Sequence, residues 1–182
     1  MKQAIEIKEN STTLRAKSIQ LILMDCDGVL TDGRIILLPT GEEIKNFHVL
    51  DGQGISLAKD AGLKIGIISG RRSKVLTRRS EELKIDFLLD KVNNKLTVYN
   101  TLLTDLKLNH HQVAFIGDDL PDIPVMQKVG LSIAVKNAAT EVKAIADLVT
   151  SRNGGKGAVR EAIEFILKSQ DIWQSVISKY YF

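Results

Sequence analysis

Several features that define whole classes of protein are scarce in this sequence. It has one cysteine, Cys26, in 182 residues, so no internal disulfide can form and a reducing compartment is expected. No apolar run approaches the roughly 20 residues of a membrane span, and the segment MKQAIEIKEN lacks the apolar core of a signal peptide. The net charge of +3 is too small to indicate nucleic-acid binding. We expect a cytoplasmic protein with no membrane and no nucleic-acid partner.

Short apolar segments alternate with helix-length amphipathic segments along the chain. The candidate strands cover 19–25, 63–69, 86–90, 113–118, 131–135 and 147–150, and the candidate helices cover 52–61, 73–84, 94–107, 121–129, 138–145 and 157–170. This alternation is typical of βαβ units, and strands that are apolar throughout are typical of a sheet buried on both faces. We predict a single α/β domain over 1–182, a Rossmann-like three-layer sandwich with a mostly parallel central sheet.

One segment interrupts the alternation. GRIILLPTGEEIKNFHV (33–49) has two extended runs around Pro39-Thr40-Gly41, the pattern of a β-hairpin. In open α/β sheets, ligands bind at the carboxyl ends of the strands. A hairpin at about 33–48, directly after the first strand, is therefore placed to act as a flap, and a surface hairpin with no such role is the alternative.

Polar side chains gather where three of the candidate strands end. These ends are Asp25-Cys26-Asp27-Gly28, Ser69-Gly70-Arg71, and Gly117-Asp118-Asp119 with Asp122 beyond. In a parallel sheet the three ends converge, and hard oxygen ligands of this kind suit Mg²⁺. Any one acidic pair could instead cap a helix, as Asp119 or Asp122 could. The three ends together favour a metal site.

These motifs resemble those of the haloacid dehalogenase superfamily of phosphatases. DCDGVLTDG is similar to its DxDGxxT/DG nucleophile motif, Ser69 in IISGR to its second motif, and GDDLPD to its fourth. The third motif is a lysine at a helix start; Lys95 in NNKL matches it best, and Lys91 is the competitor. The resemblance extends from about residue 19 to 161.

Within this superfamily, the sequence is most similar to the small, nearly capless branch that hydrolyses 3-deoxy-D-manno-octulosonate 8-phosphate. The similar features are the hairpin, FHVLDGQGI, IGDDLPDIPVM and GGKGAVRE. The resemblance implies a Mg²⁺-dependent phosphatase of lipopolysaccharide biosynthesis. It also implies a homotetramer in which each hairpin roofs a neighbour's site, and a C-terminal tail (about 154–182) that folds over a site.

The residue types and the resemblance together suggest roles. Asp25 is the expected nucleophile, forming an aspartyl-phosphate, and Asp27 the expected general acid and base. Ser69 and Lys95 would stabilise the transferring phosphoryl group. The expected metal ligands are Asp25, Asp118 and the backbone carbonyl of Asp27, with Asp119 and Asp122 behind them. The predicted substrate-binding residues are Gly28, Thr31, Gly70, Arg71 and Lys156.

Other residues receive structural expectations. Arg160 joins Arg71 and Lys156 as a candidate for the anionic groups of the substrate, which the resemblance implies are a sugar-acid carboxylate and a phosphate; the alternative for GGKG is a helix N-terminal turn. Cys26 is expected to be a small buried hydrophobe, and His48 to be structural. The aromatic residues of the tail should pack on the domain or on a partner chain; they are Trp173, Tyr180, Tyr181 and Phe182.

Two further interpretations of function stay open. The same chemistry could act on a nine-carbon keto-acid sugar 9-phosphate of the 2-keto-3-deoxynononate or sialic acid type, which the motifs do not separate from the eight-carbon substrate. From another class, the chain could be a non-catalytic regulatory or structural domain of this fold. The complete set of motif residues argues against the second interpretation.

Overall fold

A six-stranded sheet lies at the centre of the computed structural model, which describes residues 11–181. The strands are β1 (Leu21–Met24), β4 (Lys64–Ile68), β5 (Phe87–Leu89), β6 (Val113–Gly117), β7 (Leu131–Ala134) and β8 (Leu148–Val149). Their order is β5-β4-β1-β6-β7-β8, and every neighbouring pair is parallel. The predicted α/β class is confirmed, with a sheet that is entirely rather than mostly parallel.

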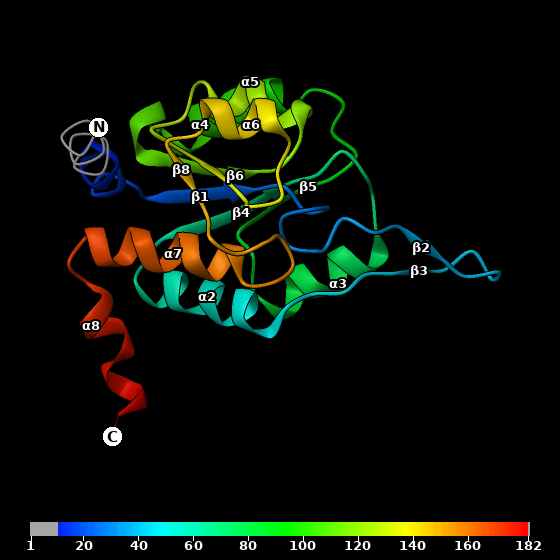
Figure 1. Cartoon of the computed structure of the whole chain (residues 1–182), viewed down its shortest axis with the longest axis horizontal. Helices are drawn as coiled ribbons and strands as arrows, with labels where there is room; N and C mark the ends of the chain where they lie inside the picture. The colour runs from blue at the N-terminus through cyan, green and yellow to red at the C-terminus, as the bar shows by residue number, and fades with distance from the viewer. Residues whose placement is uncertain (1–10, 182) are drawn as a thin grey trace.

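Helices cover both faces of this sheet. They are α2 (Val49–Asp60), α3 (Lys74–Glu82), α4 (Lys95–Leu106), α5 (Ile123–Met126), α6 (Thr140–Ile145) and α7 (Ala158–Ser169). Figure 1 shows α4, α5 and α6 on one face and α2, α3 and α7 on the other. Residues 11–16 are also helical, and a 3₁₀ turn at His110–Gln112 leads into β6. In the described part of the chain, no helix has the length and apolar character needed to cross a bilayer.

β1 is the strand that positions Asp25. All four of its residues are buried, because helices cover both sides of the sheet. Met24 pairs with Ile67 of β4 on one side and with Ile116 of β6 on the other. Asp25 follows one residue later, so it leaves the sheet between the ends of these two strands. The expected convergence of the three strand ends is thereby confirmed.

The helix boundaries differ from the sequence-based ones in two places. α2 begins three residues earlier than expected because the side chain of His48 caps it, accepting from the amide of Leu50. The single helix predicted over 121–129 is wrong. It is a 3₁₀ turn (Leu120–Asp122) followed by the four-residue α5, and each piece carries a proline in its first turn, where a missing amide costs little.

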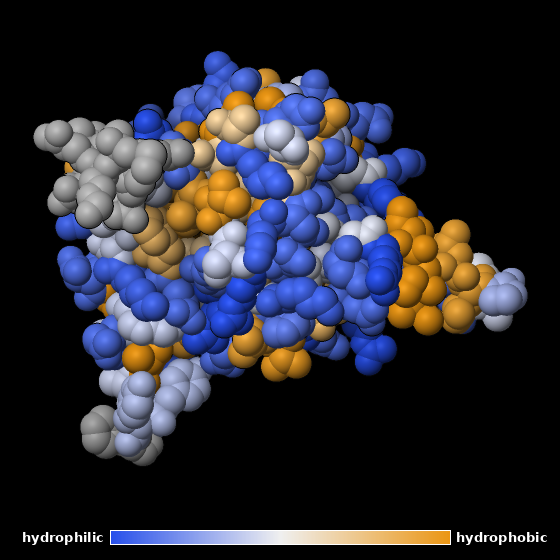
Figure 2. Space-filling model, viewed as in Figure 1, coloured by the Kyte–Doolittle hydropathy of each residue, from blue (hydrophilic) through white to orange (hydrophobic). Residues whose placement is uncertain are grey.

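The predicted hairpin is present, although its strands are short. β2 (Ile36–Leu37) and β3 (Glu43–Ile44) pair antiparallel and project from the body of the molecule (Figure 1). Its apolar side chains, Ile35, Leu37, Leu38 and Ile44, are 37–66 % exposed. Figure 2 shows them as an apolar surface on the projecting arm. An apolar surface of this kind is typical of an interaction site.

The C-terminal segment has a helix that the sequence did not suggest, α8 (Trp173–Ile177), followed by a 3₁₀ turn at Ser178–Tyr180. Trp173 packs on the domain, as expected: the guanidinium of Arg160 lies 5.5 Å from its ring centroid. Tyr180 and Tyr181 are instead 58 % and 73 % exposed on the single chain. The expectations for 1–10 and for Phe182 lie outside the described residues.

Two glycines of the C-terminal segment pack against the loop that follows β1. The amide of Gly155 donates to the carbonyl oxygen of Val29 over 2.9 Å. A Cβ added to Gly154 would lie 1.6 Å from the carbonyl oxygen of Gly28. The two backbones therefore approach more closely than any side chain permits, so this segment supports the loop directly.

We predict that Gly154→Ala lowers the free energy of unfolding by about 2–3 kcal/mol, because overpacking a buried contact with backbone costs that much. The measurement is the denaturant midpoint and slope. Gly70→Ala is the control for stability, since the nearest atom to its Cβ would lie 3.7 Å away. Equal midpoints for the two variants would contradict the close packing of these backbones.

Candidate active site

The carboxyl ends of β1, β4 and β6 open into a cavity of about 940 Å³. Most of the sequence-predicted site residues line it, namely Asp25, Asp27, Ser69, Gly70, Arg71, Lys95, Asp118, Asp119 and Asp122. Gly28, Thr31 and Lys156 are not among the lining residues. Parallel topology therefore assembles residues from four separate parts of the sequence at one edge of the sheet.

Lys95 joins two of the carboxylates. It is the first residue of α4, and its Nζ lies 2.5 Å from Oδ1 of Asp25 and 2.6 Å from Oδ1 of Asp122. All three side chains are buried. A cation at a helix N-terminus opposes the helix dipole, so the two carboxylates compensate for its position. Lys91, the competing candidate, is exposed in the turn after β5, which favours Lys95.

Asp118 presents an oxygen that has no protein partner. Its Oδ1 is buried and makes no hydrogen bond in the described structure. Gly28 makes room for its other oxygen: a Cβ at Gly28 would lie 2.0 Å from Oδ2 of Asp118. Gly28 also has a φ of +101°, which L side chains rarely adopt. A glycine is thus required here both by the turn and by the carboxylate beside it.

Asp122 and Asp119 organise the loop after β6. Oδ2 of Asp122 accepts hydrogen bonds from the amides of Asp118 and Asp119, at 2.9 and 3.3 Å, while its Oδ1 accepts from Lys95. Asp119 caps the following 3₁₀ turn by accepting from the amide of Leu120. Both carboxylates therefore have protein partners already, and their expected place behind the metal ligands stays a prediction.

Burial and mutual repulsion act on the protonation of the carboxylates that face the cavity. Burial raises the pKa of Asp25 from 3.8 to about 6, with Lys95 opposing the shift and Asp122 adding to it. The pKa of Asp118 is raised from 3.8 to about 8, mainly by burial, with the charges of Asp25 and Asp122 adding to the shift and Lys95 opposing it. At neutral pH Asp25 is mostly ionised, so it is competent as a nucleophile, whereas Asp118 holds a proton.

The arrangement suits a divalent cation. One carboxylate oxygen from each of Asp25, Asp118 and Asp122 lies within 4.8 Å of the other two. A cation would stabilise the ionised forms that burial and mutual repulsion disfavour, and it would give Oδ1 of Asp118 a partner. Since Asp122 is occupied by Lys95 and by backbone amides, Asp25 and Asp118 are the better ligands. The carbonyl of Asp27 as a third ligand stays a prediction.

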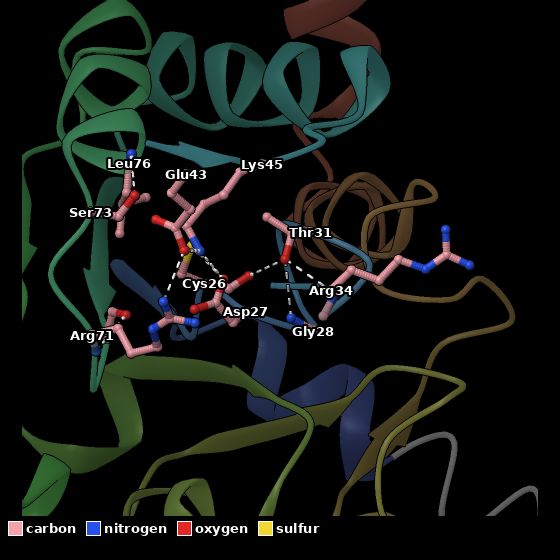
Figure 3. Close-up of polar contacts among 12 residues, drawn as sticks. Cys26, Asp27, Gly28, Thr31, Arg34, Glu43, Lys45, Arg71, Ser73 and Leu76 are labelled. Atoms are coloured by element: carbon pink, nitrogen blue, oxygen red, sulfur yellow. Dashed lines mark hydrogen bonds and ion pairs between the residues drawn. The ribbon is translucent and has the colours of Figure 1, made fainter. Parts of the chain in front are cut away.

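Asp27 has partners that the sequence analysis missed. Oδ1 of Asp27 accepts a hydrogen bond from Nζ of Lys45, on the hairpin just after β3 (Figure 3). Nζ of Lys45 also lies 3.3 Å from Glu43, and Nη2 of Arg71 lies 3.0 Å from the same oxygen of Glu43. The sequence pattern that could have predicted these contacts is the alternation of Glu43, Ile44 and Lys45, because it places the two charged side chains on one face of the strand.

Three further candidates, Thr31, Lys156 and Arg160, do not line the cavity. The hydroxyl of Thr31 is buried in the loop after β1, where it accepts from the amides of Gly28 and Gly33. Lys156 is exposed. Arg160 was a candidate for the substrate carboxylate; it is instead paired with Glu164 at 2.7 Å, on the same helix.

The structural expectations for Cys26 and His48 are confirmed, whereas the role of Ser69 stays a prediction. Cys26 is free and buried, and His48 caps α2. Ser69, at the end of β4, is buried, and its Oγ accepts from the amide of Arg71 at 3.3 Å. Its hydroxyl hydrogen is thus free to be donated to a group in the cavity.

Comparison with known proteins agrees with this geometry. Residues 76–163 match the model of the family described as haloacid dehalogenase-like hydrolase. The 3-deoxy-D-manno-octulosonate 8-phosphate phosphatase KdsC of Yersinia pestis is 45 % identical over 157 residues, 86 % of this chain and 84 % of the relative. The enzyme of the same name from Escherichia coli K12 is 44 % identical over 156 residues, 86 % of this chain and 83 % of the relative.

Solved structures extend the comparison to the fold. The 3-deoxy-D-manno-octulosonate 8-phosphate phosphatase of Moraxella catarrhalis, determined with magnesium, phosphate and KDO, superposes with a TM-score of 0.92. It is 39 % identical, and the match covers 94 % of this chain and 98 % of that one. The chain therefore belongs to the haloacid dehalogenase-like hydrolases, in the branch that contains the 3-deoxy-D-manno-octulosonate 8-phosphate phosphatases.

Proposed function

We propose that this chain is a Mg²⁺-dependent phosphatase that hydrolyses 3-deoxy-D-manno-octulosonate 8-phosphate to the free sugar acid and phosphate. The observation that carries the proposal is one cavity that holds the Asp25 and Asp27 pair, the Lys95 ammonium and the unpartnered oxygen of Asp118. The named relatives support this substrate. The proposal places the enzyme in lipopolysaccharide biosynthesis in the cytoplasm, where a single unpaired thiol is expected.

Asp25 and Asp118 are the proposed Mg²⁺ ligands, joined by the carbonyl of Asp27. When bound, the metal supplies positive charge that offsets the repulsion between a phosphate dianion and the carboxylate that attacks it. A magnesium ion is bound in the Moraxella relative. In this chain the support is chemical: the donors are hard oxygens, and one of them, Oδ1 of Asp118, has no hydrogen-bond partner within residues 11–181.

The proposed reaction has two steps. Asp25 attacks phosphorus and forms an aspartyl-phosphate while Asp27 gives a proton to the leaving sugar oxygen. Asp27 then takes a proton from the water that hydrolyses this intermediate. Lys95 and the hydroxyl of Ser69 are placed to stabilise the oxygens of the transferring group, where charge gathers in the transition state.

Arg71 is the proposed group for the sugar-acid carboxylate. It lines the cavity, and its Nη1 is buried with no hydrogen-bond partner in the described structure, while Nη2 is held by Glu43. A guanidinium with one edge fixed and one donor free is suited to bind a carboxylate. Because the nine-carbon keto-acid phosphates carry the same two anionic groups, only a substrate comparison separates them.

The proposed assembly is a homotetramer in which each hairpin roofs a neighbouring site. A hairpin whose strands are two residues long encloses little by itself. Its exposed apolar side chains, concentrated on the projecting arm in Figure 2, would be buried by a second copy. The family resemblance supports this arrangement. Residues 1–182 are proposed to form a single domain in each subunit.

The substrate proposal is tested by phosphate release from a panel of eight- and nine-carbon keto-acid sugar phosphates, with Mg²⁺ and with chelator. We expect the highest kcat/KM for 3-deoxy-D-manno-octulosonate 8-phosphate and none with chelator. Asp25→Asn should abolish turnover and keep the melting temperature near that of the wild type. Equal rates on unrelated sugar phosphates would reduce the enzyme to a general phosphatase, and no release from any substrate would indicate a non-catalytic domain.

The raised pKa values of Asp25 and Asp118 predict how metal binding depends on pH. Between about pH 4 and pH 8 the metal-free folded chain holds more protons than the unfolded chain, so its stability falls as pH rises through this window. Mg²⁺ displaces those protons. At one Mg²⁺ concentration, the gain in melting temperature should be larger at about pH 8 than at about pH 5.5.

Asp118→Asn is the matched variant for this measurement, since it removes one ligand charge and keeps the shape. It should lose most of the Mg²⁺-dependent gain at both pH values. A gain that is independent of pH, or one that Asp118→Asn retains, would remove Asp118 from the metal site.

The assembly is tested by Leu37→Glu, which places a charge on a hairpin side chain that is 66 % exposed on the single chain. We expect the wild type to be tetrameric in light scattering at micromolar concentration and the variant to dissociate, because burying an unpaired carboxylate is costly. Leu14→Glu is the control, as Leu14 is also 66 % exposed but lies far from the hairpin in the sequence. Monomeric wild-type protein would contradict the tetramer.

A further inference from the structure

Lys45 is a nearly fully buried cation on an element that is otherwise exposed. Its side chain is 1 % exposed, whereas the hairpin residues before it are largely open to solvent. Burial lowers the pKa of Lys45, but its hydrogen bond to Asp27 and the negative charge of that residue outweigh burial, so its pKa is raised and it stays charged. A buried ammonium costs free energy unless it is paired, so the partners of Lys45 account for its position.

The main partner is the residue proposed to move the proton. Both Lys45 and Cys26 donate to Oδ1 of Asp27, and Figure 3 shows Lys45 reaching from the hairpin strand down to this carboxylate. Neither donor uses the second oxygen, Oδ2. With Oδ1 held, the rotation of the carboxyl group is restricted, and Oδ2 is the oxygen left for the leaving group of the substrate.

Lys45 is itself held in place from the other side. Glu43 lies 3.3 Å from its Nζ and also receives Arg71 at 3.0 Å. Burial raises the pKa of Glu43, but hydrogen bonds from Ser73 and Lys45 outweigh it and lower that pKa, so Glu43 stays ionised. Since Ser73 begins α3, the base of the hairpin is fastened to the rigid part of the domain by charged groups.

We propose that Lys45 is a positioning residue for Asp27. Through this contact, the base of the hairpin would orient the residue that gives and takes protons in the reaction. The inference rests on the proposed role of Asp27 as general acid and base. Lys45 contacts Asp27 and Glu43, not the proposed nucleophile Asp25, so it would act by fixing which oxygen of Asp27 faces the substrate. A misplacement of a reacting group by about 1 Å can cost on the order of 10²-fold in rate.

Substrates with different leaving groups distinguish a positioning role of Lys45 from a non-specific loss of activity in the variant. A sugar alkoxide needs a proton from Asp27 in order to leave, whereas p-nitrophenolate leaves without one. Hydrolysis of the aspartyl-phosphate needs Asp27 as a base with either substrate. Loss of Lys45 should therefore slow both steps with a sugar phosphate, but only the second step with p-nitrophenyl phosphate.

The test compares Lys45→Met, Lys45→Arg and the wild type by rapid mixing with Mg²⁺, using p-nitrophenyl phosphate and whichever sugar phosphate of the panel the wild type hydrolyses. For Lys45→Met we expect kcat for the sugar phosphate to fall about 10- to 10²-fold with KM little changed. With p-nitrophenyl phosphate we expect a rapid burst of p-nitrophenolate close to one per site, then slow turnover. Lys45→Arg keeps the charge and should recover part of the loss.

Arg34→Met is the matched control, because Arg34 is a cation on the same segment that is 77 % exposed and lies 3.9 Å from Asp32. Its kinetics should equal those of the wild type. The inference is overturned if Lys45→Met slows the burst as much as sugar-phosphate turnover, or if it changes neither. If the wild type hydrolyses p-nitrophenyl phosphate but no sugar phosphate, the proposed substrate is wrong, and the burst with p-nitrophenyl phosphate still tests the role of Lys45. If the wild type hydrolyses neither kind of substrate, the proposed function and the role of Lys45 are both wrong.

Discussion

The repulsion among carboxylates at the end of β1 is the constraint on which the rest of this structure depends. Asp25, Asp118 and Asp122 bring oxygens within 4.8 Å of one another. Lys95 relieves part of that repulsion by contacting two of them, yet burial, together with the remaining repulsion, keeps the pKa values of Asp25 and Asp118 raised. The proposed nucleophile, Asp25, is therefore mostly ionised at neutral pH, and it lies beside Asp118, whose buried Oδ1 has no hydrogen-bond partner among the described residues.

The backbone around this cluster is built to hold it. β1 is buried between β4 and β6, so Asp25 leaves a rigid part of the sheet. Gly28 turns the loop beside Asp118 where a Cβ would clash, and Gly154 packs against the carbonyl of Gly28. The C-terminal segment thus supports the catalytic loop through backbone contact, which explains the value of glycine at both positions.

The hairpin combines a fixed base with an exposed, apolar arm. At the base, Glu43 pairs with Arg71 and Lys45 pairs with Asp27, and both of these partners line the cavity. Along the projecting arm, the apolar side chains face solvent on the single chain. Alternation along one short strand separates these two functions, since neighbouring side chains point to opposite faces. The acid and base of the proposed reaction is held by the same element that would meet a neighbouring subunit.

The sequence by itself determined the fold class, the six strands and the residues at the strand ends, because apolar runs that alternate with amphipathic helices have few packing solutions. The sequence was also enough to predict Asp25, Lys95 and Asp118 as site residues, because the order of the motifs and their positions at strand ends and at a helix start single them out. Tertiary structure alone decided the pairing of Lys45 with Asp27 and the support of Gly28 by Gly154. Both contacts join loops that are far apart in the sequence, and neither periodicity nor spacing along the chain encodes how those loops pack.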